Sequence, residues 1–250
     1  FETIISLFVS GKRPSGSSDP YALRRNLNGI IQIAWNSNFS IKFDFLLMKS
    51  LNFWKDNINE ISFDYENIFN EILEFIKQRI LSHLEEISIE KDIINSIFNS
   101  ELIQKSNLFE IYDLKNRINV INELKSSKIN LSLIKIISRY SKLAAKGNLE
   151  TNIYSSKDII DSNLFEKNSE NEVLNFVKKV EILLSGNNWE YKELIDIFTF
   201  HIDVLSDLFD NNKGVMIMCQ DLKTRQNRIN LISLIRNFSL IFCDFTLLNS

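Results

Sequence analysis

The sequence contains few of the residues that interrupt helices. It has 6 Gly and 2 Pro, and both prolines, Pro14 and Pro20, lie within the first twenty positions. Because proline is the strongest helix breaker, everything after Pro20 permits long helices. Hydrophobic residues make up 44% and charged residues 24% of the chain. This composition is ordinary for a folded protein that buries a sizeable core.

Cysteine and histidine are also scarce. Cys219 and Cys243 lack the spacing of a CxxC motif, and His83 and His201 are isolated from other metal-ligating residues. This pattern excludes a disulfide framework and argues against a zinc site. We interpret both histidines as packed or surface residues, and a reducing, cytoplasmic setting fits.

No apolar run is long enough to cross a bilayer, so we expect neither a membrane span nor a signal peptide. The chain starts at Phe1 within an apolar segment, ETIISLFV, and not at a methionine. We therefore expect it to be cut from a longer intracellular protein.

The net charge of −3 and the pI of about 5.6 count against a simple nucleic-acid module, which is usually basic. However, the charge is segregated along the chain. Residues 56–101 hold eleven acids and three bases, whereas 107–149 hold eight bases and three acids. A polyanion could dock on the second stretch and be repelled by the first.

Apolar residues recur at helical spacing along most of the chain. Asp19 can cap a first helix, with Pro20 at its first position. The segment 146–169 is richer in Gly, Asn and Ser and is our candidate for a mobile joint. The short apolar run 215–219 is too isolated to pair as a strand. The expected fold is all-α, an antiparallel helical bundle, with helices at about 20–36, 43–56, 65–86, 90–99, 107–126, 130–145, 170–184, 190–210 and 221–248.

No catalytic constellation is visible. Gly11 and Gly16 are spaced as in a phosphate-binding P-loop, but Ser17 stands where the lysine must be and no strand precedes the segment. A glycine-containing connection into a helix is the better interpretation. No GxSxG nucleophile motif occurs, and the paired carboxylates Glu85 and Glu86 lie where a solvated face is expected.

Several charged residues need a partner. Arg79 falls on the apolar stripe of the helix expected over 65–86, so it must pair with an acid or face a groove. We favour a buried salt bridge over a ligand contact. Asp221 and Arg225 lie one helical turn apart and can pair, which leaves Arg228 free.

An aromatic residue and four bases lie on and around the helix expected over 130–145. Proteins bind RNA loops by combining phosphate contacts with stacking of bases on aromatic side chains. A solvated basic face is at least as simple an interpretation. The residues are Lys135, Arg139, Tyr140, Lys142 and Lys146.

Two stretches carry a family resemblance. Residues 11–25, GKRPSGSSDPYALRR, match G-x-x-P-[ST]-G-S-x-D-P-x-A-L-R-R, which in bacterial glycyl-tRNA synthetase beta subunits leads from the HD-like region into the C-terminal region. Near the other end, Phe209-Asp210, then VMIM at 215–218, then Asp221-x-x-x-Arg225-x-Asn227-Arg228 resembles the C-terminal signature of the same family.

Weaker landmarks of the family occur between these two stretches in the right order, so the resemblance covers essentially the whole chain. The chain departs from the family at 143–148, LAAKGN, where a basic, Asn-containing stretch is usual, and at Lys213-Gly214, which looks like an insertion. The weaker landmarks are Phe75-Ile76-x-x-Arg79, Arg139-x-x-Lys142 and Asn163-Leu-Phe-Glu166.

The resemblance implies an α₂β₂ ligase that joins glycine to its tRNA with ATP and Mg²⁺, with the aminoacylation site on the alpha subunit. The chain would be residues 1–50, the tail of an HD-like domain with connecting helices, and residues 51–250, an anticodon-binding domain of the DALR type. We expect no cofactor and no catalytic residue in this fragment. Its partners would be glycine tRNA, the alpha subunit and the rest of the beta subunit, with no DNA and no membrane.

We expect a basic face to bind the phosphates of the anticodon arm, with Tyr140 stacking on a base. The candidate contacts are Arg225, Arg228, Lys135, Arg139 and Lys142. A structural role is expected for Asp19, Arg24, Arg25, Arg79 and Asp221: helix caps and ion pairs, those of Arg24 and Arg25 at the domain junction.

Two alternatives remain open. The bundle could be a scaffold that braces the synthetase subunits with little RNA contact, which suits the acidic stretch. A C-terminal domain of another class of tRNA ligase would require both outer motifs to be coincidence. Convergence of the bases of 107–149 and 223–236 on one face would favour RNA binding, and dispersal would favour the scaffold.

Overall fold

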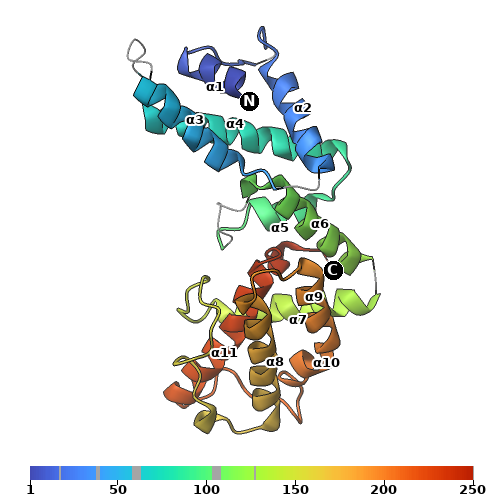
Figure 1. Ribbon diagram of the computed structural model, residues 1–250. Helices are drawn as coiled ribbons and strands as arrows, with labels where there is room; N and C mark the ends of the chain where they lie inside the picture. Colours follow the sequence, from blue (N-terminus) through green and yellow to red (C-terminus); the bar gives the residue numbers. More distant parts are fainter. Residues whose placement is uncertain (17, 38–39, 58–62, 103–107, 127, 250) are drawn as a thin grey trace. The chain divides into compact units, whose positions relative to one another are not determined.

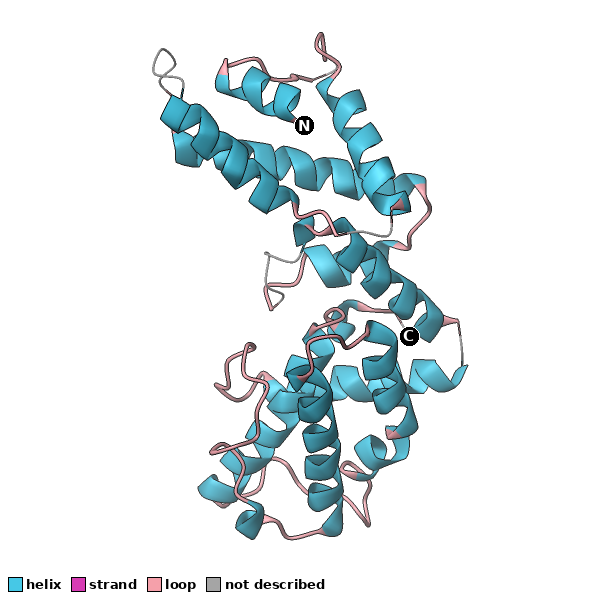
Figure 2. Cartoon of the chain, in the orientation of Figure 1, coloured by secondary structure: helices cyan, strands magenta, loops and turns pink. Residues whose placement is uncertain are grey.

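The computed structural model describes residues 1–16, 18–37, 40–57, 63–102, 108–126 and 128–249. Over these residues the chain forms eleven α-helices joined by loops and short 3-10 turns, with no β-strand (Figure 1, Figure 2). The expected all-α class is therefore confirmed, while the antiparallel DALR-type arrangement stays a prediction.

The chain divides into two compact units. The first comprises Phe1–Ile94 and Gln104–Asn116, and the second comprises Asn95–Ile103 and Arg117–Ser250. The expected division at residue 50 falls inside the first unit. It stays a prediction about how the chain is organised in the whole protein.

In the first unit, α4 is the central helix, and α1, α2 and α3 all pack against it. The side chain of Asp64 accepts a hydrogen bond from the Asn67 backbone N–H at 3.2 Å and so caps the start of α4. Ile72, Ile76 and Ile80 then follow at steps of four and are fully buried. The helices of this unit are α1 (Glu2–Val9), α2 (Leu23–Asn36), α3 (Phe43–Asn57), α4 (Tyr65–Glu86) and the first part of α5 (Lys91–Phe98).

In the second unit, α11 is the central helix and packs against α7 and α8. Its side chains are buried on nearly every side, from Asn227 to Leu240, so polar residues as well as apolar ones lie in the core. The helices of this unit are the end of α6 (Ile111–Lys125), α7 (Lys128–Ala144), α8 (Asn168–Ser185), α9 (Tyr191–Phe200), α10 (Ile202–Asp207) and α11 (Leu222–Leu240), with 3-10 turns η2 (Ser162–Leu164) and η3 (Phe245–Leu247).

The start of α2 differs from the expectation. The helix begins at Leu23 and not at Pro20, and Ala22 precedes it with a left-handed φ of 53°. The Asp19 carboxylate nevertheless accepts hydrogen bonds from the backbone N–H groups of Leu23 at 2.8 Å and Arg24 at 2.9 Å. The capping role expected for Asp19 is present, but across a turn that contains Pro20.

Two long helices of the prediction are shorter in the structure. The helix expected over 190–210 is divided at His201 into α9 and α10, and the His201 backbone N–H donates to the carbonyls of both Ile197 at 3.2 Å and Phe198 at 3.3 Å. The helix expected over 221–248 ends at Leu240, before the separate 3-10 turn η3.

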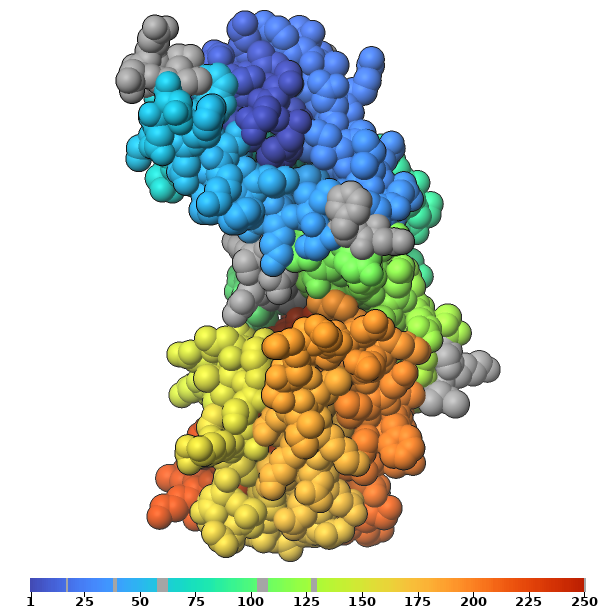
Figure 3. All heavy atoms as spheres, viewed as in Figure 1, coloured from blue at the N-terminus to red at the C-terminus, as the bar shows by residue number. Residues whose placement is uncertain are grey.

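The segment between α7 and α8 belongs to the second unit, and α11 holds it by side-chain hydrogen bonds. Asn227 both accepts from the Asp161 N–H at 2.8 Å and donates to the Asp161 carbonyl at 2.9 Å. Asn237 donates to the carbonyls of Glu150 and Ile153, both at 2.7 Å. The segment lies beside α8 in Figure 3, where the Ser156 N–H donates to Glu181. It therefore does not join the two units, contrary to the mobile joint expected at 146–169.

Candidate functional site

Helix α7 separates its residues onto two faces. Leu133, Ile137 and Tyr140 are fully buried, in a helix that packs against α11 and η3. Lys135, Arg139 and Lys142 follow one another at steps of four and three and are all exposed. Because side chains at this spacing share one side of a helix, the three cations form a single stripe, here called the α7 basic face.

The cations of the α7 basic face lack acidic partners among the described residues. Neither Lys135, Arg139 nor Lys142 forms an ion pair or a side-chain hydrogen bond there. Two other exposed lysines of the unit are paired, Lys192 with Glu123 at 2.7 Å and Lys213 with Asp207 at 2.8 Å. Lys146, Lys157, Lys178 and Lys223 are exposed without an ion pair to the described residues, but they do not follow one another at helical spacing on one helix. The α7 basic face is therefore a concentration of positive charge that the second unit does not neutralise by direct contact.

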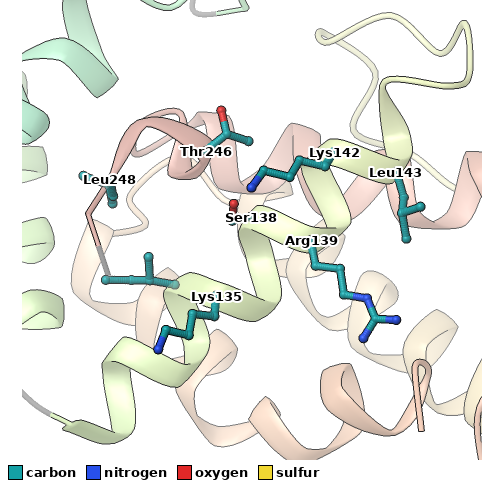
Figure 4. A pocket seen from close by; sticks show the side chains of 8 residues that line it. Lys135, Ser138, Arg139, Lys142, Leu143, Thr246 and Leu248 are labelled. Carbon is teal, nitrogen blue, oxygen red and sulfur yellow. The ribbon is translucent and has the colours of Figure 1, made fainter. Parts of the chain in front are cut away.

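A hollow of about 490 Å³ lies along this face (Figure 4). Figure 4 shows Lys135 and Lys142 extending on one side of α7, while Arg139 extends away from them. Thr246 and the apolar Leu248, near the end of the chain, form part of the wall. The hollow thus combines cations with apolar surface and is lined by Ile134, Lys135, Ser138, Arg139, Lys142, Leu143, Thr246 and Leu248.

Tyr140 lies on the opposite, buried face of α7. Its ring is 0% exposed, and its hydroxyl donates a hydrogen bond to the Leu205 carbonyl at 3.0 Å. Burial raises the pKa of Tyr140 well above its usual value, while the charge of Arg139 opposes the shift. No face of this ring is open to a base, so the stacking role expected for Tyr140 does not fit the structure, and the residue supports the core instead.

Arg228 is likewise buried and paired. Its Nε donates to the Glu170 carboxylate and its Nη2 to the Glu166 carboxylate, both at 2.8 Å, and Nη1 donates to the Met216 carbonyl at 3.2 Å. Burial disfavours the charged guanidinium, but the hydrogen bonds with the two glutamates outweigh it and raise the pKa of Arg228. The RNA contact expected for Arg228 is therefore replaced by a structural ion pair that joins α11 to α8.

Asp221 and Arg225 do not pair as expected. The Asp221 carboxylate accepts a hydrogen bond from the Thr224 backbone N–H at 2.8 Å and caps the start of α11. This hydrogen bond and that from the Thr224 side chain lower the pKa of Asp221. Arg225 is half-buried and has no ion pair with the described residues, so it remains available to a ligand.

In the first unit, Arg24 and Arg25 line a polar hollow of about 590 Å³ beside Asn28 and Glu86. Neither arginine forms an ion pair with the described residues, so the ion pairs expected for them are not seen within this unit. Arg79 is half-buried and its Nε has no hydrogen-bond partner. The salt bridge expected for Arg79 is therefore also absent from the described residues.

The other bases of 107–149 and 223–236 do not all join the α7 basic face. Lys115 donates to the Trp35 carbonyl at 2.9 Å within the first unit. Arg117 is 2% exposed and donates to the Phe242 carbonyl at 3.0 Å. Arg236 is buried and donates to the Leu149 carbonyl at 2.6 Å. These three bases therefore serve hydrogen bonds within the protein and do not add to the α7 basic face.

The histidines and carboxylates show no sign of a metal centre in the described part of the chain, where no group of three or more His, Cys, Asp or Glu residues could hold an ion. His83 is 6% exposed and packs edge-on against Trp35, with ring centroids 5.3 Å apart. Burial lowers the pKa of His83, and the charge of Glu86 opposes the shift.

No described helix is long and apolar enough to cross a membrane.

Phe209 lies in the C-terminal family signature but was not assigned to this site from the sequence. Its ring lies under the Arg139 guanidinium, with 4.2 Å between Cζ and the ring centroid, and meets Tyr140 edge-on at a centroid distance of 4.7 Å. Arg139 and Phe209 are seventy positions apart, so spacing carried no signal. The sequence did hold a signal for the burial of Arg228, since Leu231 and Ile235 follow it at three and seven positions on the apolar stripe of α11.

Comparison with known proteins adds an independent observation. Residues 1–99 match the family model described as glycyl-tRNA synthetase beta subunit. Over 252 residues the chain is 30% identical to the glycine–tRNA ligase beta subunit of Trichodesmium erythraeum. The aligned region covers 98% of this chain and 34% of that protein.

Relatives from other organisms show the same pattern. The glycine–tRNA ligase beta subunit of Lactococcus lactis is 31% identical over 252 residues, covering 100% of this chain and 32% of that protein. That of Clostridioides difficile is 26% identical over 247 residues, covering 98% of this chain and 33% of that protein. The chain thus spans about a third of the length of the curated relatives it matches, and it is similar to that third almost from end to end.

Proposed function

We propose that this chain is the C-terminal part of a glycyl-tRNA synthetase beta subunit, with the tail of an HD-like domain followed by a DALR-type anticodon-binding domain. Three observations support this: similarity over 98% of the chain to proteins named as such subunits, the two outer sequence motifs, and the all-helical architecture. The whole enzyme would be a cytoplasmic α₂β₂ ligase that attaches glycine to its tRNA with ATP and Mg²⁺ bound by the alpha subunit.

Within that enzyme, the second unit would bind the anticodon arm of glycine tRNA. The observation that carries this proposal is the α7 basic face, on which Lys135, Arg139 and Lys142 share one exposed stripe without an ion pair to the described residues. Phosphate contacts from such a stripe orient a nucleic acid without reading its sequence. Arg225, which is half-buried and also lacks an ion pair with the described residues, is a further candidate contact.

Such a role is positional. Glycylation would take place on the alpha subunit, and the second unit would hold the anticodon arm so that the acceptor end reaches that site. Binding energy from contacts remote from the reacting atoms is then used to orient the substrate. We propose the alpha subunit and the remainder of the beta subunit as the protein partners.

The test of RNA binding is the salt dependence of affinity for glycine tRNA. In the variant with Lys135→Gln and Lys142→Gln, two phosphate contacts disappear, so the slope of log K against log salt should become shallower by about 1.5. The affinity should fall accordingly at low salt. Fluorescence anisotropy of labelled tRNA, titrated at several salt concentrations, measures both quantities.

The matched control replaces two lysines that already have acidic partners, Lys192 and Lys213, with glutamine. It changes the net charge by the same amount as the test variant but leaves the α7 basic face intact. Equal slopes for the test variant, the control and the unaltered chain would remove the assignment of RNA binding to α7.

A scaffold remains the second candidate function. The use of Lys115, Arg117 and Arg236 in hydrogen bonds within the protein favours it over RNA binding, and so does one feature of the first unit. Helix α3 exposes Phe45 to 50% and Phe53 to 61%, together with Leu46 and Met48. Apolar side chains gathered on one exposed helix are typical of surfaces that pack against another protein segment. If the chain showed no affinity for glycine tRNA at low salt, this function would take first place.

A further inference from the structure

Arg139 differs from the other cations of the α7 basic face because its guanidinium is held in place. It lies over the ring of Phe209, with 4.2 Å from Cζ to the ring centroid. Phe209 meets the buried ring of Tyr140 edge-on at 4.7 Å, and Tyr140 is fixed by its hydrogen bond to the Leu205 carbonyl. A column of two aromatic rings anchored in the core therefore supports an exposed planar cation.

This support leaves one side of the guanidinium free. The Phe209 ring lies on one side of the guanidinium, while Arg139 as a whole is exposed and has no ion pair with the described residues. The carboxylates that lie close to Phe209 in the sequence have other partners: Asp207 pairs with Lys213 at 2.8 Å, and Asp210 accepts from the backbone N–H groups of Asn212 and Lys213. The second face of Arg139 and its N–H edge are therefore available to a ligand.

We propose that Arg139 is a stacking platform for an unpaired RNA base, a role that rests on the proposed RNA binding of the second unit. Unstacked bases of RNA loops stack on aromatic rings and on arginine guanidinium planes. A guanidinium already lying on an aromatic ring presents its other face at the right orientation before the RNA arrives. Less conformational freedom is then lost on binding than with an unsupported arginine.

The directions of the three cationic side chains indicate how a single RNA strand would lie on α7. Lys135 and Lys142 extend on one side of α7 and border the hollow, whereas Arg139 extends away from them (Figure 4). A single strand crossing α7 can set neighbouring phosphates against the two lysines and turn a base onto Arg139. The platform would thus bind an anticodon-loop base splayed out of the loop, while Tyr140 acts only by supporting Phe209.

Arg139→Lys separates stacking from charge, because lysine keeps the positive charge but has no planar group. We expect the affinity for the anticodon stem-loop of glycine tRNA to fall about tenfold, within the range reported for loss of one stacked base. The salt slope should stay unchanged. Lys192→Arg is the matched control, since it also preserves charge but lies outside the α7 basic face, where Lys192 pairs with Glu123 at 2.7 Å, and it should bind as tightly as the unaltered chain.

Abasic stem-loops locate the base. Each loop position is made abasic in turn, and the unaltered chain and the Arg139→Lys variant are each titrated with each RNA. At one position the Arg139→Lys change should not lower the affinity further, because the base that stacks on Arg139 is already absent from that RNA. Phe209→Leu, which keeps every charge but removes the supporting ring, should lower affinity at the same position, with thermal unfolding confirming that the variant is folded.

Undiminished affinity of the Arg139→Lys variant would overturn the platform, as would a loss of equal size with every abasic RNA, which would mean a phosphate contact. A different result is expected if the second unit does not bind RNA through the α7 basic face. In that case the variant with Lys135→Gln and Lys142→Gln would bind the stem-loop as tightly as the unaltered chain. If that double variant loses affinity and Arg139→Lys does not, RNA binding stands and the platform alone is removed.

Discussion

The two arginines of α11 that belong to the outer sequence motif have opposite environments. Arg228 has a side chain 2% exposed and pairs with Glu170, which is 0% exposed, whereas Arg225 is half-buried without an ion pair among the described residues. A motif position can therefore be recognised from sequence without its role being known. The partners of Arg228 lie about sixty positions earlier in the chain, and only the packing of α8 against α11 brings them together.

The ion pair predicts an unequal response to the same substitution. Arg228→Met leaves the Glu170 carboxylate buried without its cation, so the free energy of unfolding should fall by about 3–5 kcal/mol. Arg225→Met removes no ion pair to the described residues and should change the free energy of unfolding by less than about 0.5 kcal/mol. Urea unfolding followed by circular dichroism measures both values. Similar effects for the two variants would show that the pair does not hold α8 and α11 together.

Most helices could be predicted from the sequence, because the helix-capping residues and the spacing of apolar residues indicate the same spans. The expected span of 65–86 coincides with α4, Tyr65–Glu86, since an N-cap at Asp64 precedes an unbroken apolar stripe. The division at His201 could not be predicted, because no Gly or Pro marks it in the sequence. The end of α11 at Leu240 was missed because the apolar residues that follow it, such as Phe242 and Phe245, are buried like those of α11 but are not α-helical.

Helix α11 also orders the long segment that precedes α8. Asn237→Ala removes the donor of two hydrogen bonds to the carbonyls of Glu150 and Ile153, and should destabilise this segment by about 1–3 kcal/mol. Trypsin cleavage after Lys157, which is exposed, should then become faster. Asn230→Ala is the control, because its hydrogen bond to the Ile159 carbonyl is long, at 3.5 Å. Equal cleavage rates for both variants would contradict this account of the segment.

At the scale of the whole molecule, the uneven charge along the sequence indicated a basic stretch but not the contacts that its residues make. The basic stretch 107–149 does supply the α7 basic face, but Lys115 and Arg117 within it serve intramolecular hydrogen bonds. Tyr140 was chosen for its type and its neighbours, and its position in the helix places it in the core. Phe209, which lies on a different segment, could not be connected to Arg139 without the fold.

The central claim is that the chain binds the anticodon arm of glycine tRNA. Its most direct test is the affinity of the chain for that tRNA beside the same tRNA with a replaced anticodon, over a range of salt concentrations. The account predicts tighter binding to the native anticodon, with the difference persisting as salt weakens the phosphate contacts. Equal, weak binding that vanishes with salt would contradict it, because only non-specific phosphate contacts would then remain.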